Sequence, residues 1–511
     1  MKRTNFNFLL ISLLFLTSCL NSQKNLNSIE IIEINKNNNW IEILPESYGF
    51  NTNTVDGPSW NDIRFLNMIQ GLNPGNMRYP GGTVGNYMNW RTGQFMDYDA
   101  RDPNRNKVRG TSIGHVKLSQ YINTYRPEEF KNAIDLTGST PIYMVNILTD
   151  TLGSILEMLE HCKKIGLQIK YVELGNEMFF TYYPGGNFQN KILGDYANQH
   201  HFPTSISYAE ECNKWIKAIK NKFPDVEISY NVVYGKYAEE WYQESPRSNQ
   251  WNKTMLNNIK GTDRVTLHHY AVLAQQKTAI DGLKFSLDSY RSCFKFIRDS
   301  LIGKKVWFTE YNNKGGNVNR NPETPENPWS GRWIHGMNAS LLTCMMLTEP
   351  QVELHCIHNL ASSATIALIT AKDYIIPSCP ENNKAVTIKA FEYTASGSTH
   401  VILGKVLNRA SKVKWLAFDN NPRIPVTHGE LDVIYGIAID DKDGQRLMLY
   451  NFSDKYHKVS LGEFSKLSVS NSYFMSSLVE PVTGFNSIMQ KQDNLQSGKV
   501  LLKPFSITVV M

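Results

Sequence analysis

The sequence predicts an α/β protein in which a (β/α)8 TIM barrel is followed by a C-terminal antiparallel β-sandwich domain. Three observations support this fold. The chain has 511 residues, which is too long for one compact core. In its middle, short apolar runs alternate with helical patterns, as expected of a parallel sheet. After about residue 370 the runs become short and alternating, as in antiparallel strands.

Eight runs have the length and composition of buried barrel strands. They lie at 48–51, 76–80, 141–146, 171–177, 226–233, 264–270, 305–311 and 352–360. Stretches between them show apolar residues at helical spacing, notably 151–165, 205–223 and 283–301. These elements place the catalytic barrel at 45–370.

The remaining runs predict the sandwich at 371–511. Its expected strands lie at 384–393, 400–406, 430–438, 446–452 and 500–511, separated by Asn, Asp and Gly. A strand-like segment at 28–43 is expected to join this sheet, so residues 20–44 form a tether and an N-terminal strand.

The N-terminus has the organisation of an export signal. Lys2 and Arg3 precede an apolar stretch at 8–16, which is too short to span a bilayer. It ends in Leu-Thr-Ser-Cys19, which resembles a bacterial lipobox, so residues 1–19 are expected to be a lipoprotein signal peptide with Cys19 lipidated. The expected location is the outer membrane, the cell surface or the periplasmic face. The alternative is an ordinary cleaved signal with a chance Cys.

Composition narrows the functional classes. A 41% hydrophobic and 20% charged chain is neither disordered nor membrane-spanning. The net charge of +6 is mild, and no Lys/Arg run predicts a nucleic-acid partner. Six cysteines beyond Cys19 have no Cys-x-x-Cys spacing, so most are expected to be buried apolar residues.

Two acidic residues at the ends of apolar runs organise the predicted site. Glu177 closes Tyr-Val-Glu-Leu-Gly-Asn-Glu, and Glu310 lies in Lys-Val-Trp-Phe-Thr-Glu. A buried carboxylate is costly unless it is paired or used. The separation of 133 residues (310 minus 177) fits the fourth and seventh strands of the barrel, whose carboxyl ends carry the chemistry. Such a pair is the minimal machinery for cleaving a glycosidic bond.

The two carboxylates are expected to have different roles. Glu177 would be the general acid/base, positioned by Asn176, which requires the strand to end or bulge there because adjacent strand residues face opposite sides. Glu310 would be the nucleophile, with the two carboxyl groups about 5–5.5 Å apart. The competing interpretation is that either Glu caps a helix or pairs with an Arg.

Further strand-end residues are candidate substrate ligands. His268 and Tyr270 share one strand face, so Tyr270 is expected to orient Glu310 and His268 to contact substrate or the acid/base. Arg78 would hold Glu310 ionised or bind a hydroxyl. Asn51 and Asn146 are candidate hydroxyl ligands, and structural roles are the alternative for each of these residues.

Three long loops, at 83–111, 178–203 and 312–330, are expected at the same barrel face. Their aromatic residues include Trp90 and Trp329, which are candidate sugar-stacking rings or loop anchors. The first loop carries cations that would favour an acidic or sulfated glycan, unless its Asp residues neutralise them: Arg91, Arg101, Arg105, Lys107 and Arg109. No metal site is expected, because the histidines lack ligand spacing, and no cofactor is implied.

These motifs resemble the retaining glycoside hydrolases of clan A. The segment ending Leu-Gly-Asn-Glu177 is similar to the acid/base motif of that clan, and Val-Trp-Phe-Thr-Glu310 to its nucleophile strand. Arg78-Tyr-Pro-Gly-Gly resembles α-L-arabinofuranosidases, whereas Val-Thr-Leu-His-His-Tyr270 and Gly303-Lys-Lys-Val-Trp look more like the heparanase and β-glucuronidase branch. The likeness covers roughly 45–360, and Leu-Tyr-Asn-Phe452 resembles the sandwich appended to such enzymes.

The resemblance implies a retaining glycosidase that acts by double displacement on a polysaccharide or oligosaccharide, with Glu177 as acid/base and Glu310 as nucleophile. It leaves the sugar open. Two other classes fit the same residues: a polysaccharide lyase acting on a uronic-acid glycan with Tyr270 or His268 as base, and a non-catalytic carbohydrate-binding lipoprotein.

Overall fold

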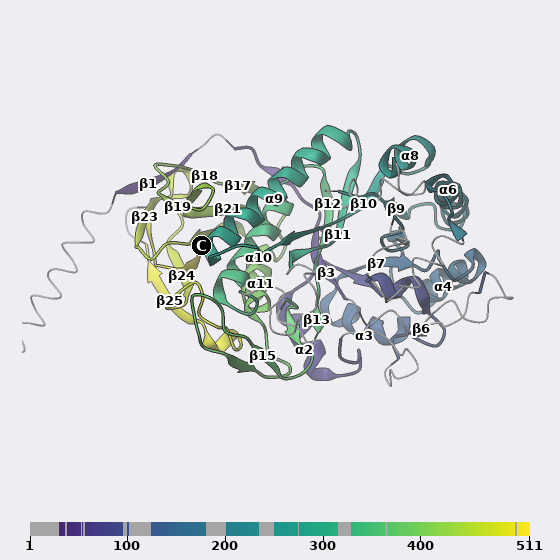
Figure 1. Ribbon diagram of the computed structural model, residues 1–511, viewed down its shortest axis with the longest axis horizontal. Coiled ribbons are helices and arrows are strands. Elements are labelled where there is room, and N and C mark those ends of the chain that lie inside the picture. Colours follow the sequence, from purple (N-terminus) through teal and green to yellow (C-terminus); the bar gives the residue numbers. More distant parts are fainter. Residues whose placement is uncertain are drawn as a thin grey trace, which may run out of the picture.

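The computed structural model contains a closed barrel with a β-sandwich packed beside it (Figure 1). It describes residues 30–35, 38–52, 54, 57–95, 100–101, 124–179, 201–234, 250–273, 275–314, 329–362, 366–495 and 498–511. The expected signal peptide and Cys19 lie outside these residues. In the described part of the chain, no helix combines the length and apolarity needed to cross a bilayer.

The barrel is formed by eight parallel strands and confirms the predicted fold class. The strands are β3 (Tyr48–Asn51), β4 (Asn76–Tyr79), β7 (Thr140–Val145), β8 (Tyr171–Leu174), β9 (Glu227–Asn231), β10 (Arg264–Val272), β11 (Lys305–Lys314) and β12 (Val352–His358). Each pairs with its neighbours in chain order, and β12 closes on β3. All eight strands overlap the eight apolar runs, because strands buried on both faces read as continuous apolar sequence.

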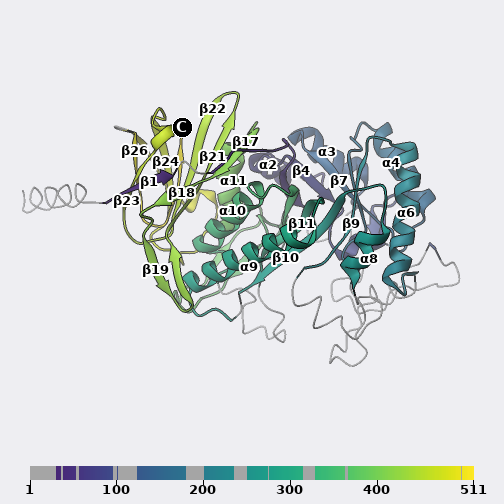
Figure 2. The same ribbon diagram turned by 90° about the horizontal axis from the view of Figure 1, so that it is seen from above.

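Helices surround the barrel (Figure 2). They are α2 (Ile63–Leu72), α3 (Pro127–Thr137), α4 (Leu152–Lys164), α6 (Ser205–Lys222), α8 (Trp251–Asn258), α9 (Ala279–Ser300), α10 (Trp333–Leu347) and α11 (Ala395–Leu407). Short polar side chains begin several of them: Thr151, Thr204 and Thr278 each accept a backbone N–H of the first turn. The predicted helices at 151–165, 205–223 and 283–301 correspond to α4, α6 and α9.

The second domain is a sandwich of a seven-stranded and a four-stranded sheet. The larger sheet contains β2 (Ile41–Glu42), β17 (Lys412–Trp415), β21 (Ile434–Asp441), β22 (Gly444–Asn451), β24 (Val469–Phe474), β25 (Met489–Asn494) and β27 (Ser506–Val510). The smaller contains β1 (Ile31–Asn35), β18 (Ala417–Asp419), β23 (His457–Ser460) and β26 (Lys499–Leu502). Ile32, Leu449 and Val500 belong to one buried cluster that joins the two sheets. Thus β1 and β2, from the N-terminal segment, lie within the sandwich.

Short elements complete the described fold. They are the strands β5 (Met88–Asn89), β6 (Gln94–Phe95), β13 (Ala361–Ser362), β14 (Ile369–Thr370), β15 (Tyr374–Ile376), β16 (Val386–Ile388), β19 (Arg423–Val426) and β20 (Gly429–Asp432), and the 3-10 turns η2 (Thr83–Tyr87), η4 (Gly462–Phe464) and η5 (Phe485–Ser487).

The segment at 400–406, predicted to be a strand, lies instead in helix α11. Thr394 caps this helix, and its residues from Ala395 to Gly404 are all buried. A helix that is buried on every side lacks an apolar stripe of 3.6-residue period, so its β-branched residues read as a strand. Because α11 follows β12 and packs against α10 and α2, the ring of barrel helices continues past residue 370.

The predicted strand at 384–393 is also shorter than expected. Only β16 is extended, and its partner is β15 rather than either sheet of the sandwich. A β-strand can pair only over the length of its partner strand, and β15 has three residues. Phe391 then turns the chain with φ of 58°.

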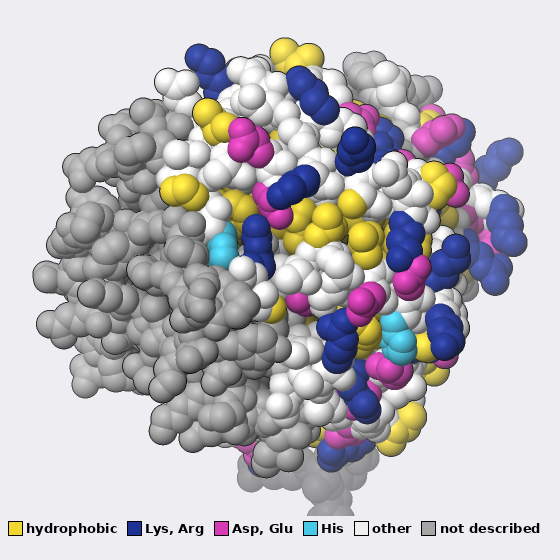
Figure 3. All heavy atoms as spheres, turned by 90° about the vertical axis from the view of Figure 1, so that its right-hand side faces the viewer, with side chains coloured by type: hydrophobic (Ala, Val, Ile, Leu, Met, Phe, Trp, Pro, Cys, Tyr) yellow, Lys and Arg dark blue, Asp and Glu magenta, His cyan; other side chains and the backbone are white. Residues whose placement is uncertain are grey.

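The outer face of the barrel carries interleaved charges of both signs. Figure 3 shows Lys and Arg side chains beside Asp and Glu over the side that α4 and α6 occupy in Figure 1. Ion pairs on these helices include Lys222–Glu160 at 2.5 Å and Lys214–Glu211 at 2.7 Å. Local pairing therefore divides this face into small regions of opposite charge.

Candidate active site

The carboxyl ends of six barrel strands bring polar side chains together at one pole. Arg78 lies on β4, Glu310 on β11, and His268 and Tyr270 on β10. Asn51 and His358 are the last residues of β3 and β12. Asn176 and Glu177 follow β8, which ends at Leu174. The structure thus groups most of the predicted site residues where barrel chemistry is located.

The chain turns sharply between β8 and Glu177. Gly175 has φ of 76°, and a Cβ atom there would meet Ile147 Cγ2 at 2.7 Å. Glu177 itself has φ of 48°, an uncommon conformation for a non-glycine residue. With the strand ended, Asn176 and Glu177 face the same site, which the alternation of a regular strand would prevent.

Glu310 is buried and fully hydrogen-bonded. Its Oε1 accepts Arg78 Nη1 at 2.9 Å and Asn51 Nδ2 at 3.1 Å. Its Oε2 accepts the Tyr270 hydroxyl at 2.6 Å. These contacts fix the carboxylate in one orientation and satisfy its charge.

The same neighbours decide the protonation of Glu310. Burial raises the pKa of this carboxyl, but the charges of His268, His358 and Arg78 and the Tyr270 hydroxyl outweigh burial and hold the pKa well below the ordinary range. Burial, followed by the charge of Glu310, raises the pKa of Tyr270 well above its usual value. Tyr270 is therefore a hydrogen-bond donor, and Glu310 is an ionised acceptor.

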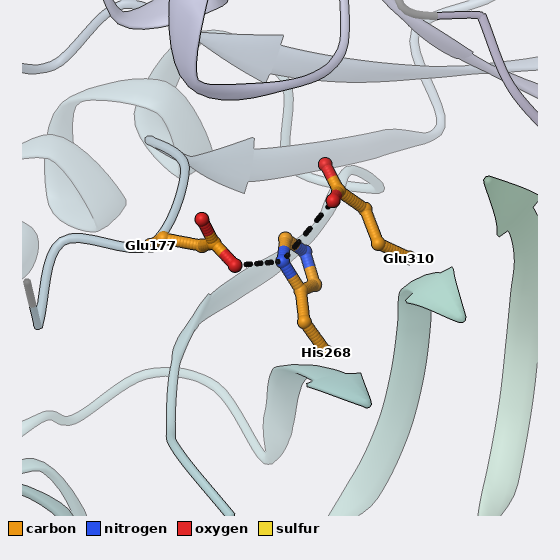
Figure 4. A group of neighbouring side chains, drawn as sticks. All are labelled: Glu177, His268 and Glu310. Carbon is orange, nitrogen blue, oxygen red and sulfur yellow. Dashed lines mark hydrogen bonds and ion pairs between the residues drawn. The ribbon is translucent and has the colours of Figure 1, made fainter. Parts of the chain in front are cut away.

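Glu177 contacts different groups. Its Oε1 lies 3.0 Å from His268 Nδ1, and its Oε2 lies 3.5 Å from Asn176 Nδ2. Figure 4 shows His268 between the two glutamates, with its Nδ1 also 3.7 Å from Glu310 Oε2. Burial lowers the pKa of His268, but Glu310 and then Glu177 outweigh it, so the pKa is raised.

The two carboxylates are close. One oxygen of Glu177, one ring nitrogen of His268 and one oxygen of Glu310 all lie within 4.8 Å of one another. This proximity is compatible with the spacing of about 5–5.5 Å found in retaining glycosidases. The three atoms could also accept a cation, but Arg78 already supplies a positive charge to Glu310 at 2.9 Å.

Arg78 also pairs with Glu173, a residue that the sequence analysis did not assign to the site. Glu173 accepts Arg78 Nε at 2.6 Å and Nη2 at 2.9 Å, and neither side chain is exposed. Arg78 Nη2 also donates to Asn176 Oδ1 at 2.7 Å. The signal was present, since Glu173 is a carboxylate inside the apolar run Tyr-Val-Glu-Leu and a buried charge requires a partner.

His358 is a second residue that the sequence did not assign to the carbohydrate site. Its Nδ1 lies 2.7 Å from Asn51 Nδ2 and 3.7 Å from Glu310 Oε2. Its ring also makes an edge contact with Tyr270. Nothing in its sequence neighbourhood indicates a partner of the nucleophile, so the sequence pattern could not assign it.

The other predicted ligands lie apart from the carboxylates in their described contacts. Asn146 accepts Thr149 N at 2.9 Å and donates to Met88 O, so it holds a turn after β7. Trp90 donates to Ser154 Oγ at 3.2 Å and lines, with Asn146, a small hollow beside β4 and β7. Trp329 is buried and donates to Glu381 at 2.8 Å.

The first-loop cations are only partly described. Arg101 pairs with Glu211 at 3.2 Å and Arg91 with Glu157. Arg105, Lys107 and Arg109 lie outside the described residues, as do most of the other two long loops. The described cations are therefore neutralised by helix carboxylates rather than directed at the site.

The comparisons with known proteins come from structure alone. No protein-family model matches the chain, and no curated protein is significantly similar to it. Solved structures align with 94% of the chain. One is the GH51 α-L-arabinofuranosidase from Thermotoga petrophila RKU-1, with 16% identity, a TM-score of 0.63 and 99% of its own chain covered.

Two other solved structures are comparably similar. AbfB, a family 51 α-L-arabinofuranosidase from Bifidobacterium longum, has 16% identity and a TM-score of 0.64, with 94% of this chain and 98% of AbfB covered. A 4-O-α-L-rhamnosyl-β-D-glucuronidase from Fusarium oxysporum 12S has 14% identity and a TM-score of 0.57, with 94% of this chain and 100% of that chain covered. These neighbours are clan A glycoside hydrolases. The predicted resemblance is confirmed at the level of architecture: this chain, like these glycoside hydrolases, combines a closed eight-stranded parallel barrel with a C-terminal sandwich.

Proposed function

We propose that this protein is a retaining glycosidase acting on a polysaccharide or oligosaccharide, with Glu310 as nucleophile and Glu177 as general acid/base. The observation that carries the proposal is the pair of close carboxylates in unlike surroundings. Arg78, Asn51 and Tyr270 donate to Glu310, whereas Glu177 shares a hydrogen bond with His268. One carboxylate is thereby kept as an acceptor and the other is in contact with a proton carrier.

In the first step of the proposed reaction, a Glu310 oxygen forms a bond to the anomeric carbon as the glycosidic bond breaks. The leaving oxygen takes the proton from Glu177. Arg78 and Tyr270 orient the attacking carboxylate, because both donate to it at 2.9 Å or less.

In the second step, Glu177 acts as a base. It removes a proton from water, whose oxygen attacks the anomeric carbon while the bond to Glu310 breaks. The sugar leaves with its original configuration, Glu310 is again a carboxylate, and Glu177 is again protonated. No cofactor is needed for this cycle.

For the substrate, the similar structures suggest two first candidates. The two family 51 arabinofuranosidases suggest aryl α-L-arabinofuranosides, and the fungal glucuronidase suggests aryl β-D-glucuronides. An acidic or sulfated glycan is the further candidate suggested by the first loop. A panel of these glycosides, with neutral and uronic polymers read by product size, tests the choice.

Substitution of the two glutamates tests the reaction itself. Glu310→Gln and Glu177→Ala should each lower kcat by at least about 100-fold. NMR of the product formed by the parent protein should show retained configuration at the anomeric carbon. Glu349→Gln is the matched control, because Glu349 is equally buried but lies away from the site beside Arg298. Full activity of Glu310→Gln would overturn the proposal.

Two other results would also replace it. An unsaturated product detected by ultraviolet absorbance would identify a polysaccharide lyase, although a Tyr270 hydroxyl with a raised pKa is a poor base. Binding of glycans without turnover across the panel would identify a carbohydrate-binding protein.

We also propose that the protein is exported and anchored by a lipid on Cys19. The support is the charged, apolar and small-residue pattern of residues 1–19. Detergent-phase partitioning and radiolabelled palmitate incorporation should both be lost in Cys19→Ala. Equal partitioning of the two proteins would contradict the anchor.

A further inference from the structure

A closed ring of hydrogen bonds runs beneath the two glutamates. From Glu177 it passes to His268, whose Nε2 lies 2.9 Å from Thr309 Oγ1. Thr309 Oγ1 donates to Glu173 Oε1 at 3.2 Å. Glu173 accepts from Arg78, which returns through Asn176 to Glu177. Thr309 and Glu173 are fully buried, so neither side chain reaches the solvent-facing space above the two carboxylates.

The ring fixes which atom of His268 carries hydrogen. Glu173, paired twice with a guanidinium, is an acceptor only. The single hydroxyl proton of Thr309 is therefore used on Glu173, and Thr309 offers His268 a lone pair. His268 Nε2 must then be protonated in order to donate to that oxygen.

This assignment also determines the protonation of the hydrogen bond between His268 Nδ1 and Glu177. With Nε2 protonated, the bond between His268 Nδ1 and Glu177 contains one shared proton, carried by either atom. The opposite neutral tautomer would donate Nδ1–H to Glu177 and leave it a carboxylate without a proton for the leaving group. The tautomer thus decides whether the pair can act as an acid.

We propose that Thr309 and Glu173 are positioning residues that hold His268 in the Nε2–H tautomer, and so keep one proton on the His268–Glu177 pair. This inference rests on the proposed glycosidase function. In glycosylation the pair transfers this proton to the leaving oxygen. In deglycosylation it regains one from water, so the pair returns to its starting state with no other reactant.

The groups facing His268 are consistent with this role. Glu177 approaches from the end of β8, and Glu310 and Thr309 from β11. The Arg78 charge acts on it from β4. Two carboxylates therefore favour a protonated pair, and one guanidinium limits how firmly the proton is held.

Thr309→Val and Thr309→Ser form a matched test in the full chain, since valine keeps the shape and serine keeps the hydroxyl. With a substrate whose poor leaving group needs acid assistance, Thr309→Val should lose about 10- to 100-fold in kcat/KM, part of what a general acid contributes. With a 2,4-dinitrophenyl glycoside, which needs no acid, kcat/KM should change less than about threefold. Thr309→Ser should restore both values.

A second measurement does not depend on turnover. In protein labelled with 15N at histidine, the His268 ring signals, identified by their loss in His268→Gln, should show Nε2 protonated. In Thr309→Val this signature should change to a mixture of tautomers, and in Thr309→Ser it should not.

The outcomes separate the two proposals. An unchanged His268 signature in Thr309→Val, or equal losses for both leaving groups, would overturn the positioning role while leaving Glu177 and Glu310 as catalytic residues. Activity that survives Glu310→Gln would instead overturn the glycosidase function, whatever Thr309 does.

Discussion

At the scale of single residues, the site separates two chemically identical side chains by what touches them. Glu310 receives three donors and lies almost fully buried, whereas Glu177 faces one imidazole and keeps 17% of its side chain exposed. In the proposed reaction, this exposure would let Glu177 exchange a proton with a leaving group or water. Burial would keep Glu310 fixed until a sugar carbon reaches it.

Tyr270→Phe should move the acidic limb of the pH profile of kcat/KM to higher pH. The hydroxyl is one of the groups that lower the pKa of Glu310, so its removal raises that pKa and protonates the nucleophile at less acidic pH. The lost bond to a charged group is worth about 1.5–3 kcal/mol, a fall of about 10–100-fold in kcat/KM. Initial rates from acid to neutral pH measure both effects.

Tyr230→Phe is the control for that experiment. Tyr230 is a buried residue of β9 whose hydroxyl has no hydrogen-bond partner among the described residues. Its removal should leave the pH profile unchanged. A shift of equal size in both variants would mean that Tyr270 acts through packing rather than through Glu310.

The residues that sequence could predict are those whose position on a strand end is visible in the chain. Arg78, His268, Tyr270 and Glu310 lie on predicted barrel strands and Asn176 lies just after one, and the structure brings them together. Glu173 and Thr309 lie one layer deeper. Their partners come from other strands, at distances of 95 and 136 residues along the chain, and only the folded barrel shows that pairing.

At the scale of elements, close approach of backbones explains where glycine is required. Helix α11 packs so tightly that a Cβ on Gly404 would meet Leu72 O of α2 at 2.3 Å. Helix α4 has the opposite situation, because a Cβ on exposed Gly153 would meet nothing within 4 Å. The two glycines therefore have different costs of substitution.

Gly404→Ala should lower the free energy of unfolding by about 1–3 kcal/mol, the range for overpacking a buried site. Gly153→Ala should instead raise it by about 0.5–1 kcal/mol, because alanine favours the helix. Urea unfolding of both variants beside the parent protein measures the difference. Equal and small effects would show that α2 and α11 can move apart.

An element could be predicted where its sequence pattern differs clearly from that of its neighbours. The eight barrel strands are isolated apolar runs between turns, so all eight could be found. Helix α11 could not, because both of its sides are covered and its sequence, Ala-Ser-Gly-Ser-Thr-His-Val-Ile-Leu-Gly, carries no polar stripe. Tertiary contact with α2 and α10, rather than local pattern, determines its conformation.

At the scale of the whole molecule, three buried imidazoles lie where the barrel meets its last two helices. Burial lowers the pKa of His335 and His400 to about 4 and of His355 to about 3. Their hydrogen bonds include His400 to Thr343 at 3.0 Å and His355 to Tyr311 at 3.1 Å. The junction is therefore built around neutral histidines.

Stability should fall as the pH is lowered from about 6.5 towards 4. In that window the unfolded chain binds more protons at these histidines than the folded one does, so stability decreases with decreasing pH. At about pH 5, each imidazole should lower the free energy of unfolding by about 2 kcal/mol. Urea unfolding at several pH values measures the slope, and His400→Gln should flatten it. Loss of the slope would show that these rings are solvated in the folded protein.

The burial of α10 extends this argument to the way the protein can be divided. All fifteen of its residues are buried, and Trp333 and Arg332 at its start donate to backbone oxygens of Phe505 and Val479 in the C-terminal region. A barrel expressed without residues 412–511 would expose an apolar helix on every turn and would aggregate rather than fold. The barrel and sandwich are consequently expected to fold as one unit, and grafting a foreign sandwich would require redesign of α10 and α11 as well.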